Sequence, residues 1–372
     1  MVVQTIRGGI AMRLRGIGFA LLLLSCILTI SGCGFGFEKS LKEIDPPKVD
    51  YVKDGEQMED NETGVTKEGE VEEATGEEAA DEATGMTTRQ LYLLDANGMV
   101  VPQSVELPAV EGAAKQALEY LVVDGPVTEM LPNGFKAVLP AGTVIQGVDQ
   151  VDETVVVDFS NEFKDYAAEN EKQILEAVTW TLTQFDGIEK VKIQINGYDQ
   201  QEMPVNGTPI GESVSRANGI NHEMGNVVDV SNSEDVTVYF MAQSEDYAYY
   251  VPVTKRMEGV SDDVRGVLKG LMEGPAVHSG LFSQLSKDVK LLKAEEEDGL
   301  LTLDFNEAIL TGSEEMVIQK DIINSLVLSL TEKESINEVA ITVDGHPEVI
   351  DEAGNALSEP VSRPEDVNKV GF

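Results

Sequence analysis

Apolar residues recur with two different periods along most of the chain, which indicates strands and helices in succession. Residues 91–94 and 99–102 are mostly apolar and flank an Asp-Ala-Asn-Gly sequence, so they predict a β-hairpin with its turn at Asn97-Gly98. Between residues 110 and 122 the apolar side chains fall on one stripe at helical spacing, which predicts a helix.

Three further kinds of element follow this first helix. Residues 144–148 and 154–159 predict two more β segments. Residues 174–185 place their apolar side chains on one face of a longer helix, in which Trp180 is expected to pack into the core. Strict alternation over 191–195 predicts a closing strand with one face buried.

The same succession occurs a second time in the chain. Five short sequences of the first half have counterparts in the second half, in the same order and at offsets of 146 to 149 residues. The pairs are Leu91-Tyr92-Leu93 with Val238-Tyr239-Phe240, Asp124-Gly125-Pro126 with Glu273-Gly274-Pro275, 155–159 with 301–305, 181–183 with 329–331, and 188–197 with 336–345. The chain therefore contains two copies of one domain, large enough for independent cores.

The second copy repeats each predicted element. It has a hairpin over 238–253, a helix over 264–272, β segments at 289–294 and 300–305, and a helix over 322–330. The order β-β-α-β-β-α-β predicts an α+β fold in which each copy is a β-sheet with two helices packed on one face.

Each of the shorter predicted helices ends at a Gly-Pro pair. Gly125 and Gly274 are expected to adopt the left-handed conformation that caps a helix, and Pro126 and Pro275 to prevent its continuation.

The first 33 residues have the layout of a bacterial lipoprotein signal. Arginines precede fourteen mostly apolar residues at 17–30, which is short for a membrane-spanning helix of about 20 residues. The sequence Ile-Ser-Gly-Cys that ends at Cys33 resembles a lipobox, so Cys33 is expected to become the acylated N-terminus, carrying diacylglycerol and palmitate. Two or more acyl chains give stable anchoring. An uncleaved signal anchor with an incidental cysteine is the alternative.

An acidic segment separates the predicted lipidation site from the repeats. Residues 50–85 include 14 acidic and two basic residues, too polar a composition to form a packed core, so a disordered and self-repelling linker is predicted. The predicted organisation is a signal peptide over 1–32, the lipidated cysteine and linker over 33–88, a first domain over 89–218, an interdomain linker over 219–234, and a second domain over 235–372.

The overall charge and the cysteine positions exclude several functions. Lys and Arg total 27 against 67 Asp and Glu, a formal charge of −40, which argues against nucleic-acid binding and against docking of the folded part on an anionic membrane. The two cysteines, Cys26 and Cys33, both precede the repeats. The repeats therefore have no disulfide, no cysteine-bound zinc and no thiol nucleophile, and no cofactor or metal site is predicted.

Two equivalent carboxylates are the strongest candidates for chemistry. Asp158 and Asp304 each precede a phenylalanine at the end of a predicted strand. A lone carboxylate cannot serve as both acid and base, so a turn-forming role, in which the side chain accepts backbone N–H bonds, is favoured. The acidic run 295–298 lacks the alternating pattern of a calcium loop and is interpreted as a solvated turn. No catalytic residue is predicted.

These features together resemble one known family. A lipoprotein signal, an acidic tether and two copies of helix–(Asp/Glu)-Gly-Pro, strand–Asp-Phe, helix–Leu-Thr and Val-x-Ile-x-(Ile/Val)-(Asn/Asp)-Gly look like the sporulation and spore germination lipoproteins with tandem GerMN domains, the GerM family. The resemblance implies domains similar to ring-building motifs. It also implies a lipid-anchored protein on the outer face of the cell membrane.

The resemblance further implies a non-catalytic scaffold or assembly factor with protein partners in a septal, transenvelope sporulation complex, with an effect on germination and peptidoglycan as a second possible contact. The edges of the hairpins 91–101 and 238–253 are the expected contact surfaces, since edge strands leave unpaired backbone groups. The alternative is a peptidoglycan-acting enzyme or wall-remodelling cofactor, which needs a carboxylate of raised pKa such as Asp158, Glu162 or Asp304.

Overall fold

The computed structural model describes residues 85–223, 230–245, 247–258, 264–312 and 316–369, all of which belong to one compact unit, Gly76–Phe372. The predicted signal peptide, Cys33 and the acidic segment up to residue 84 lie outside these described residues. No helix in the described part is both long enough and apolar enough to cross a membrane. The two repeats are hereafter the first module, from β1 to β7, and the second module, from β8 to β16.

The first module contains the strands and helices that the periodicity predicts. Short 3₁₀ turns and two brief strands supplement them. The elements are β1 (Met86–Leu94), β2 (Val100–Pro108), α1 (Ala113–Glu119), η1 (Pro126–Glu129), β3 (Ile145–Val151), β4 (Thr154–Phe159), η2 (Asn161–Lys164), η3 (Ala168–Asn170), α2 (Glu171–Leu182), β5 (Lys190–Ile195), β6 (Tyr198–Asp199), β7 (Val214–Ser215) and η4 (Arg216–Asn218).

The second module repeats this order. Its elements are η5 (Val230–Asn232), β8 (Ser233–Gln243), β9 (Ala248–Glu258), α3 (Val264–Glu273), β10 (Leu281–Phe282), β11 (Leu291–Glu297), β12 (Leu300–Phe305), η6 (Glu307–Ile309), β13 (Val317–Ile318), α4 (Lys320–Leu330), β14 (Glu338–Val343), β15 (Ile350–Asp351) and β16 (Val361–Ser362). The predicted duplication and the α+β class are both confirmed.

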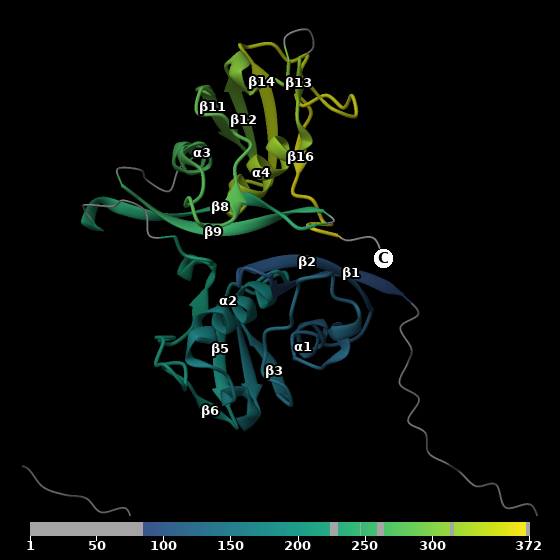
Figure 1. Cartoon of the computed structure of the whole chain (residues 1–372), viewed down its shortest axis with the longest axis vertical. Helices are drawn as coiled ribbons and strands as arrows, with labels where there is room; N and C mark the ends of the chain where they lie inside the picture. Colours follow the sequence, from purple (N-terminus) through teal and green to yellow (C-terminus); the bar gives the residue numbers. More distant parts are fainter. Residues whose placement is uncertain (1–84, 224–229, 246, 259–263, 313–315, 370–372) are drawn as a thin grey trace, which may run out of the picture. The chain divides into compact units, whose positions relative to one another are not determined.

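Within each module the helices lie between a hairpin and a larger sheet (Figure 1). In the first module β1 and β2 form the hairpin, and the larger sheet has the order β3-β4-β5-β6 with β7 also paired to β5. In the second module β8 and β9 form the hairpin, and the larger sheet has the order β11-β12-β14-β16. The central pairs, β4 with β5 and β12 with β14, are parallel because a helix connects them. The structure thus adds a second β layer to the predicted sheet.

Burial on both sides explains the composition of the longer helices. Helix α2 contacts β1 of the hairpin and β5 of the sheet, and its residues from Ile174 to Leu182 are all buried. A helix enclosed by two layers is apolar around most of its circumference. The hydroxyl of Thr181 in α2 accepts the N–H of Tyr92 at 3.1 Å, and Ser329 in α4 accepts the N–H of Tyr239 at 2.8 Å. The same polar contact thus positions each hairpin on its helix.

The end of the first short helix differs from the prediction. Helix α1 ends at Glu119, and the residue with left-handed backbone is Asp124, with φ of 60°, while Gly125 is extended with φ of −85°. A Cβ atom on Gly125 would lie 2.7 Å from the carbonyl oxygen of Val122, so close backbone approach is what requires glycine there. In the second module Gly274 directly follows α3 and has φ of 75°, as predicted.

Candidate functional site

Each module ends in a short arm that pairs with the hairpin of the other module. The first arm, residues 218–223, follows β7 and runs along β9. The N–H of Ile220 donates to the hydroxyl of Thr254 at 2.8 Å, and the N–H of Thr254 donates to the carbonyl oxygen of Ile220 at 2.8 Å. Farther along, the N–H of Glu223 donates to the carbonyl oxygen of Thr254 at 2.9 Å. The predicted linker therefore begins as a structural part of the second module's hairpin.

The second arm, residues 365–369, reciprocates this pairing on β2. The N–H of Ser104 donates to the carbonyl oxygen of Val367 at 3.1 Å, and the hydroxyl of Ser104 donates to the carbonyl oxygen of Glu365 at 3.3 Å. Ser104 and Thr254 are equivalent, because each lies two residues after a proline that pairs with Tyr92 or Tyr239. The backbone bond matches in the two modules, since the N–H groups of Thr254 and Ser104 donate to residues 220 and 367, which are equivalent; the hydroxyl of Thr254 accepts a bond from its arm, whereas that of Ser104 donates one.

One asparagine in each arm links β2 to β9. The side-chain amide of Asn221 donates to the carbonyl oxygens of Val100 at 2.7 Å and Pro252 at 2.8 Å, and its oxygen accepts the N–H of Val100 at 2.8 Å. Asn221 has left-handed backbone with φ of 46°, a conformation that asparagine tolerates better than most residues.

Asn368 makes the equivalent set of contacts. Its amide donates to the carbonyl oxygens of Tyr250 and Pro102, both at 2.8 Å, and its oxygen accepts the N–H of Tyr250 at 2.7 Å. Its backbone is also left-handed, with φ of 58°. Since β2 and β9 have no direct ladder between them in the described sheets, these two amides supply bridging hydrogen bonds between the hairpins.

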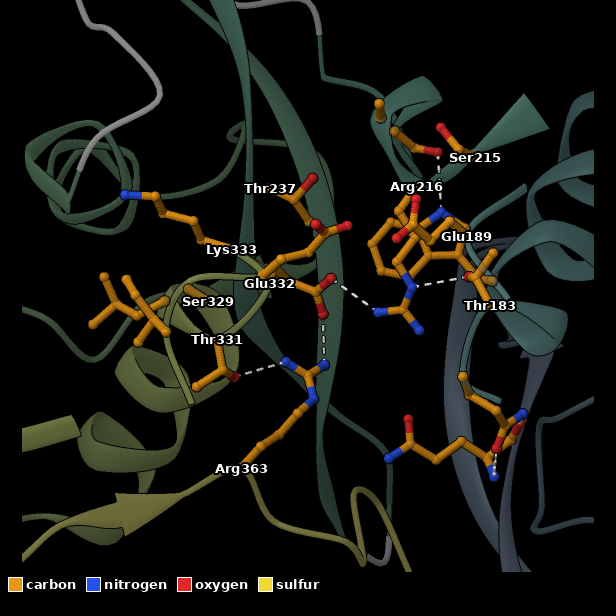
Figure 2. A pocket seen from close by; sticks show the side chains of 18 of the residues that line it. Thr183, Glu189, Ser215, Arg216, Thr237, Ser329, Thr331, Glu332, Lys333 and Arg363 are labelled. Carbon is orange, nitrogen blue, oxygen red and sulfur yellow. Dashed lines mark hydrogen bonds and ion pairs between the residues drawn. The ribbon is translucent and has the colours of Figure 1, made fainter. Parts of the chain in front are cut away.

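Two equivalent arginines meet a single carboxylate beside the arms (Figure 2). Arg216 follows β7 and Arg363 follows β16, and they lie 147 residues apart. Arg216 Nη1 lies 2.9 Å from Glu332 Oε2, and Arg363 Nη2 lies 2.6 Å from Glu332 Oε1. Each arginine also donates to the hydroxyl at its own helix end, Arg216 to Thr183 at 2.9 Å and Arg363 to Thr331 at 3.0 Å. Glu332 therefore joins an arginine of the first module to one of the second.

The environment of Glu332 keeps it ionised. Burial alone would raise the pKa of Glu332, but the charges of Arg363 and Arg216 and a hydrogen bond from Tyr239 outweigh burial and lower the pKa to about 2. A general acid or base works best with a pKa near the operating pH, so Glu332 is unsuited to proton transfer. Its negative charge instead offsets the two guanidinium groups.

These side chains line a cavity of about 1200 Å³ between the modules. Its wall includes Trp180, on whose ring the Arg216 guanidinium stacks at 4.5 Å from the ring centre. The hydroxyl-bearing residues Thr183, Ser329 and Thr331 also contribute (Figure 2). The cavity is lined by both polar and apolar residues, and its charged residues are of both signs.

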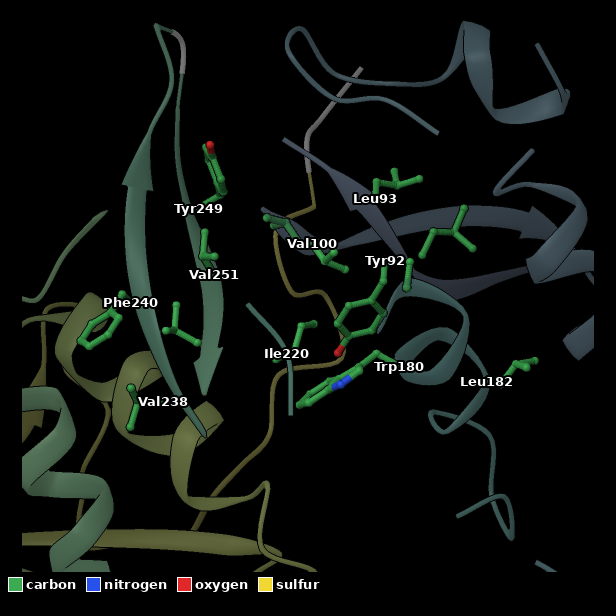
Figure 3. Close-up of a cluster of buried hydrophobic side chains, with 14 of the residues drawn as sticks. Tyr92, Leu93, Val100, Trp180, Leu182, Ile220, Val238, Phe240, Tyr249 and Val251 are labelled. Carbon is green, nitrogen blue, oxygen red and sulfur yellow. The ribbon is translucent and has the colours of Figure 1, made fainter. Parts of the chain in front are cut away.

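Apolar contacts continue across the same interface (Figure 3). One buried cluster contains Tyr92, Val100 and Trp180 of the first module together with Tyr249 and Val251 of the second. At its edge the hydroxyl of Tyr249 donates to buried Asp95 at 2.8 Å, and Asp95 also accepts the N–H groups of Asn97 and Met99 at 2.8 Å each in the β1–β2 turn. The modules therefore share one hydrophobic core.

Two carboxylates of helix α2 have opposite pKa shifts. The pKa of Glu176 is raised to about 7 by burial. The effect of burial outweighs two that lower the pKa, a hydrogen bond from the N–H of Asn221 at 3.1 Å and the charge of Lys172. For Glu171, burial is outweighed by hydrogen bonds from the backbone of Asn206 and from Thr208, and its pKa is lowered to about 2. Glu171 clamps the 205–208 loop, whereas Glu176 supports the first arm.

The carboxylates singled out from the sequence occupy turns. Asp158 accepts the N–H of Gly197 at 2.9 Å, and Asp304 accepts the N–H of Gly345 at 2.8 Å, so each holds the tight turn after the closing strand. Exposed Glu162 has a lowered pKa because the Ser160 side chain donates to it. Among the described residues no group of three or more His, Cys, Asp or Glu side chains is arranged to hold a metal ion.

The predicted contact edges are largely occupied within the chain. The second arm covers part of β2, the first arm covers part of β9, and β10 pairs with β8 at Ala242 and Met241. The hairpins thus pack against one another and against the arms. The sequence motifs did not predict a role for Arg216, Arg363, Asn221, Asn368 or Glu332. The two arginines and the two asparagines do recur at the repeat offset of 147 residues, and this recurrence is the signal that indicates them.

Comparisons with known proteins agree with the duplicated architecture. The chain matches the Germane family, described as "Sporulation and spore germination", over residues 90–201 and 237–349. It is 46% identical over 355 residues to the spore germination protein GerM of Bacillus subtilis (strain 168), covering 94% of this chain and 96% of that protein. The solved tandem GerMN domains of B. subtilis GerM superpose with a TM-score of 0.72 at 50% identity, covering 76% of this chain and all of that one.

The bridging asparagines lead to a stability prediction. In Asn221→Gly and Asn368→Gly the new glycine can adopt the same left-handed backbone, but the contacts of the amide side chain are lost. Each substitution is therefore expected to lower the free energy of unfolding by about 1–3 kcal/mol. Urea unfolding followed by circular dichroism measures the change. Asn196→Gly is the matched control, because Asn196 is exposed and left-handed with φ of 50° but lies in a turn. Losses no larger than that of the control would contradict the bridging role.

The two α2 carboxylates predict opposite pH dependences. The native state holds a proton on Glu176 more tightly than the unfolded chain, so its contribution to stability is present below pH 4.5 and is lost as the pH rises through about 7. Glu176→Gln should therefore be more stable than the parent at pH 8, by at most about 3 kcal/mol.

Glu171 provides the opposite case in the same unfolding experiment. Its stabilisation is present above pH 4.5 and is lost as the pH falls toward about 2. Glu171→Gln should destabilise the protein at pH 7 by about 1–3 kcal/mol, because the loop N–H groups lose a charged acceptor. If Glu176→Gln and Glu171→Gln both raised or both lowered the free energy of unfolding at neutral or higher pH, the opposite pKa shifts assigned to the two carboxylates would be refuted.

Proposed function

The chain belongs to the sporulation and spore germination (Germane) family, and from this premise we propose that it is a lipid-anchored, non-catalytic scaffold of an envelope complex formed during sporulation. The single observation that carries the proposal is the use of three partly buried charges between the modules. Arg216, Arg363 and Glu332 join the two modules, and Glu332 is held ionised by the arginines. A site organised in this way holds two domains in a fixed arrangement and is not suited to proton transfer.

Anchoring is proposed through Cys33. A lipobox-like sequence ends at this cysteine, and the segment that follows is strongly acidic. Acyl chains would hold the N-terminus at the membrane, while the like charges of the segment repel one another and anionic headgroups. This arrangement would keep the paired modules at a distance from the lipid surface on the extracytoplasmic side.

Partner contact is proposed at the outer edges of the two larger sheets. Strand β3 lies at the edge of the first sheet and β11 at the equivalent edge of the second, and in the described part of the chain each is paired on one side. An edge strand presents unpaired N–H and C=O groups that another chain can extend. These strands replace the hairpins as the proposed contact surfaces, because the hairpin edges are engaged by the arms.

Localisation tests the scaffold and anchor together. A fluorescent fusion in sporulating cells is expected at the septal membrane, and Cys33→Ala should release it into the surrounding compartment, since the acyl chains would be absent. A photo-crosslinking residue at Asp149 in β3 or Ala294 in β11 should capture envelope proteins, and one at Glu106, beside the second arm, should not. Septal assembly that is normal in the absence of the protein, with no captured partner, would rule the proposal out.

A wall-hydrolysis assay tests the alternative of an enzyme. Glu176 is the buried carboxylate whose pKa is raised to about 7, so it is the group to remove alongside the two turn aspartates. Purified protein incubated with peptidoglycan is expected to release no more muramic acid than a blank, and Glu176→Gln, Asp158→Asn and Asp304→Asn should behave alike. Release that disappears in any of these variants would favour a peptidoglycan-acting enzyme.

A further inference from the structure

The interface between the modules is nearly two-fold symmetric, with a break in charge at its centre. Asn221 and Asn368 make equivalent bridges, and Arg216 and Arg363 make equivalent bonds to Thr183 and Thr331. A two-fold arrangement places the same surface of each module against the other. The same face of the fold therefore forms both halves of this interface.

The break is a carboxylate in one module where the other has an amide. Glu332 corresponds to Gln184 at the repeat offset of 148 residues. The side chain of Gln184 instead bonds to β1 of its own module. It donates to the carbonyl oxygen of Gln90 at 2.6 Å and accepts the N–H of Gln90 at 2.9 Å. At the position that meets the arginines the first module therefore brings an uncharged amide beside Arg216, while the second brings Glu332 beside Arg363. The first module's own carboxylate in this cavity, Glu189, is exposed.

We propose that this face is a pairing surface for modules of the same fold, and that the carboxylate at position 332 selects the partner. The partner to which we assign it, besides the first module, is a second copy of the second module. Two second modules would bring two arginines and two carboxylates, a balanced set. Two first modules would bring two copies of Arg216 and two amides at the position of Glu332, with the exposed Glu189 as their carboxylate in the cavity. Removing charge from water without a partner at the centre is costly.

The ion pair of Glu332 and Arg363 is partly shielded from solvent. The Glu332 side chain is 10% exposed and that of Arg363 24% exposed, so solvent screens this pair less than it would a surface pair. The apolar side chains around this centre differ between the modules, with Leu328 in place of Trp180, but such a difference changes the area buried and not the balance of charge. The choice of partner is thus assigned to the charges.

The first test cuts the whole chain between its modules. A protease site inserted between residues 226 and 227 allows the folded protein to be cleaved, and size-exclusion chromatography with light scattering then reports whether the halves stay together. Co-elution as a single particle is expected, because the arms and the shared core join the halves without the peptide link. Separation of the halves at micromolar concentration would overturn the proposal.

A pair of variants then tests the selecting charge. In the cut chain, Glu332→Gln is expected to raise the dissociation constant of the halves at least about 10-fold. This is less than the loss typical of a fully buried ion pair, because Arg216 and Arg363 are 29% and 24% exposed. Glu334→Gln is the matched control, because it makes the same change of charge at an exposed position lining the same cavity. Equal affinities in the two variants would overturn the role of Glu332, and circular dichroism of the uncut variants establishes that both fold.

Mixing cut chains tests the partner. When an isotope-labelled and an unlabelled preparation are mixed in 0.5 M salt and returned to low salt, native mass spectrometry should detect pairs of two second modules and no pairs of two first modules. Pairs of first modules in equal abundance would overturn the selection by charge. These measurements use purified protein without lipid, so their outcome is independent of the anchored scaffold proposed above.

Discussion

The reciprocal exchange of arms is the constraint on which the rest of the structure depends. Each arm leaves the last strand of its own module and pairs with the hairpin of the other, and its asparagine bonds to both hairpins at once. Strands β2 and β9 can therefore lie together without a ladder of their own. An amide side chain has two donors and an acceptor, so a single residue can satisfy carbonyl oxygens on both sides and an N–H on one. Few other side chains have this combination in so short a length.

Apolar burial and charge have different consequences at this interface. The shared core, from Tyr92 and Trp180 to Tyr249 and Val251, removes large side chains from water and supplies most of the favourable free energy. The Arg216–Glu332–Arg363 group carries one more positive than negative charge, and such groups usually gain little beyond their desolvation cost. We therefore infer that this group mainly fixes positions: it holds the ends of α2 and α4 relative to the residues that follow β7 and β16.

Periodicity predicted the local elements well, because each helix and strand owes its pattern to burial against its own module. Asp158 and Asp304 were interpreted correctly for the same reason, since a turn carboxylate bonds to backbone close in space to its strand. The arms were not predicted. Residues 219–223 have no alternating pattern and were assigned to a linker, since their hydrogen bonds go to residues as distant as Val100. The cavity escaped prediction because Glu332 gains its role from an arginine 116 residues away.

Comparison of the two copies separates what joins the modules from what distinguishes them. The shared residues, two asparagines and two arginines, make the bonds of the interface. The residues that differ lie at its centre, where Glu332, Leu328 and Asn324 stand in place of Gln184, Trp180 and Glu176. The outer edge strands differ as well, since β11 ends in three glutamates and β3 in Asp-Gln-Val. A duplicated module with the same joining asparagines and arginines and unlike outer edges presents two different faces at a fixed separation, which is the property that a scaffold with more than one neighbour requires.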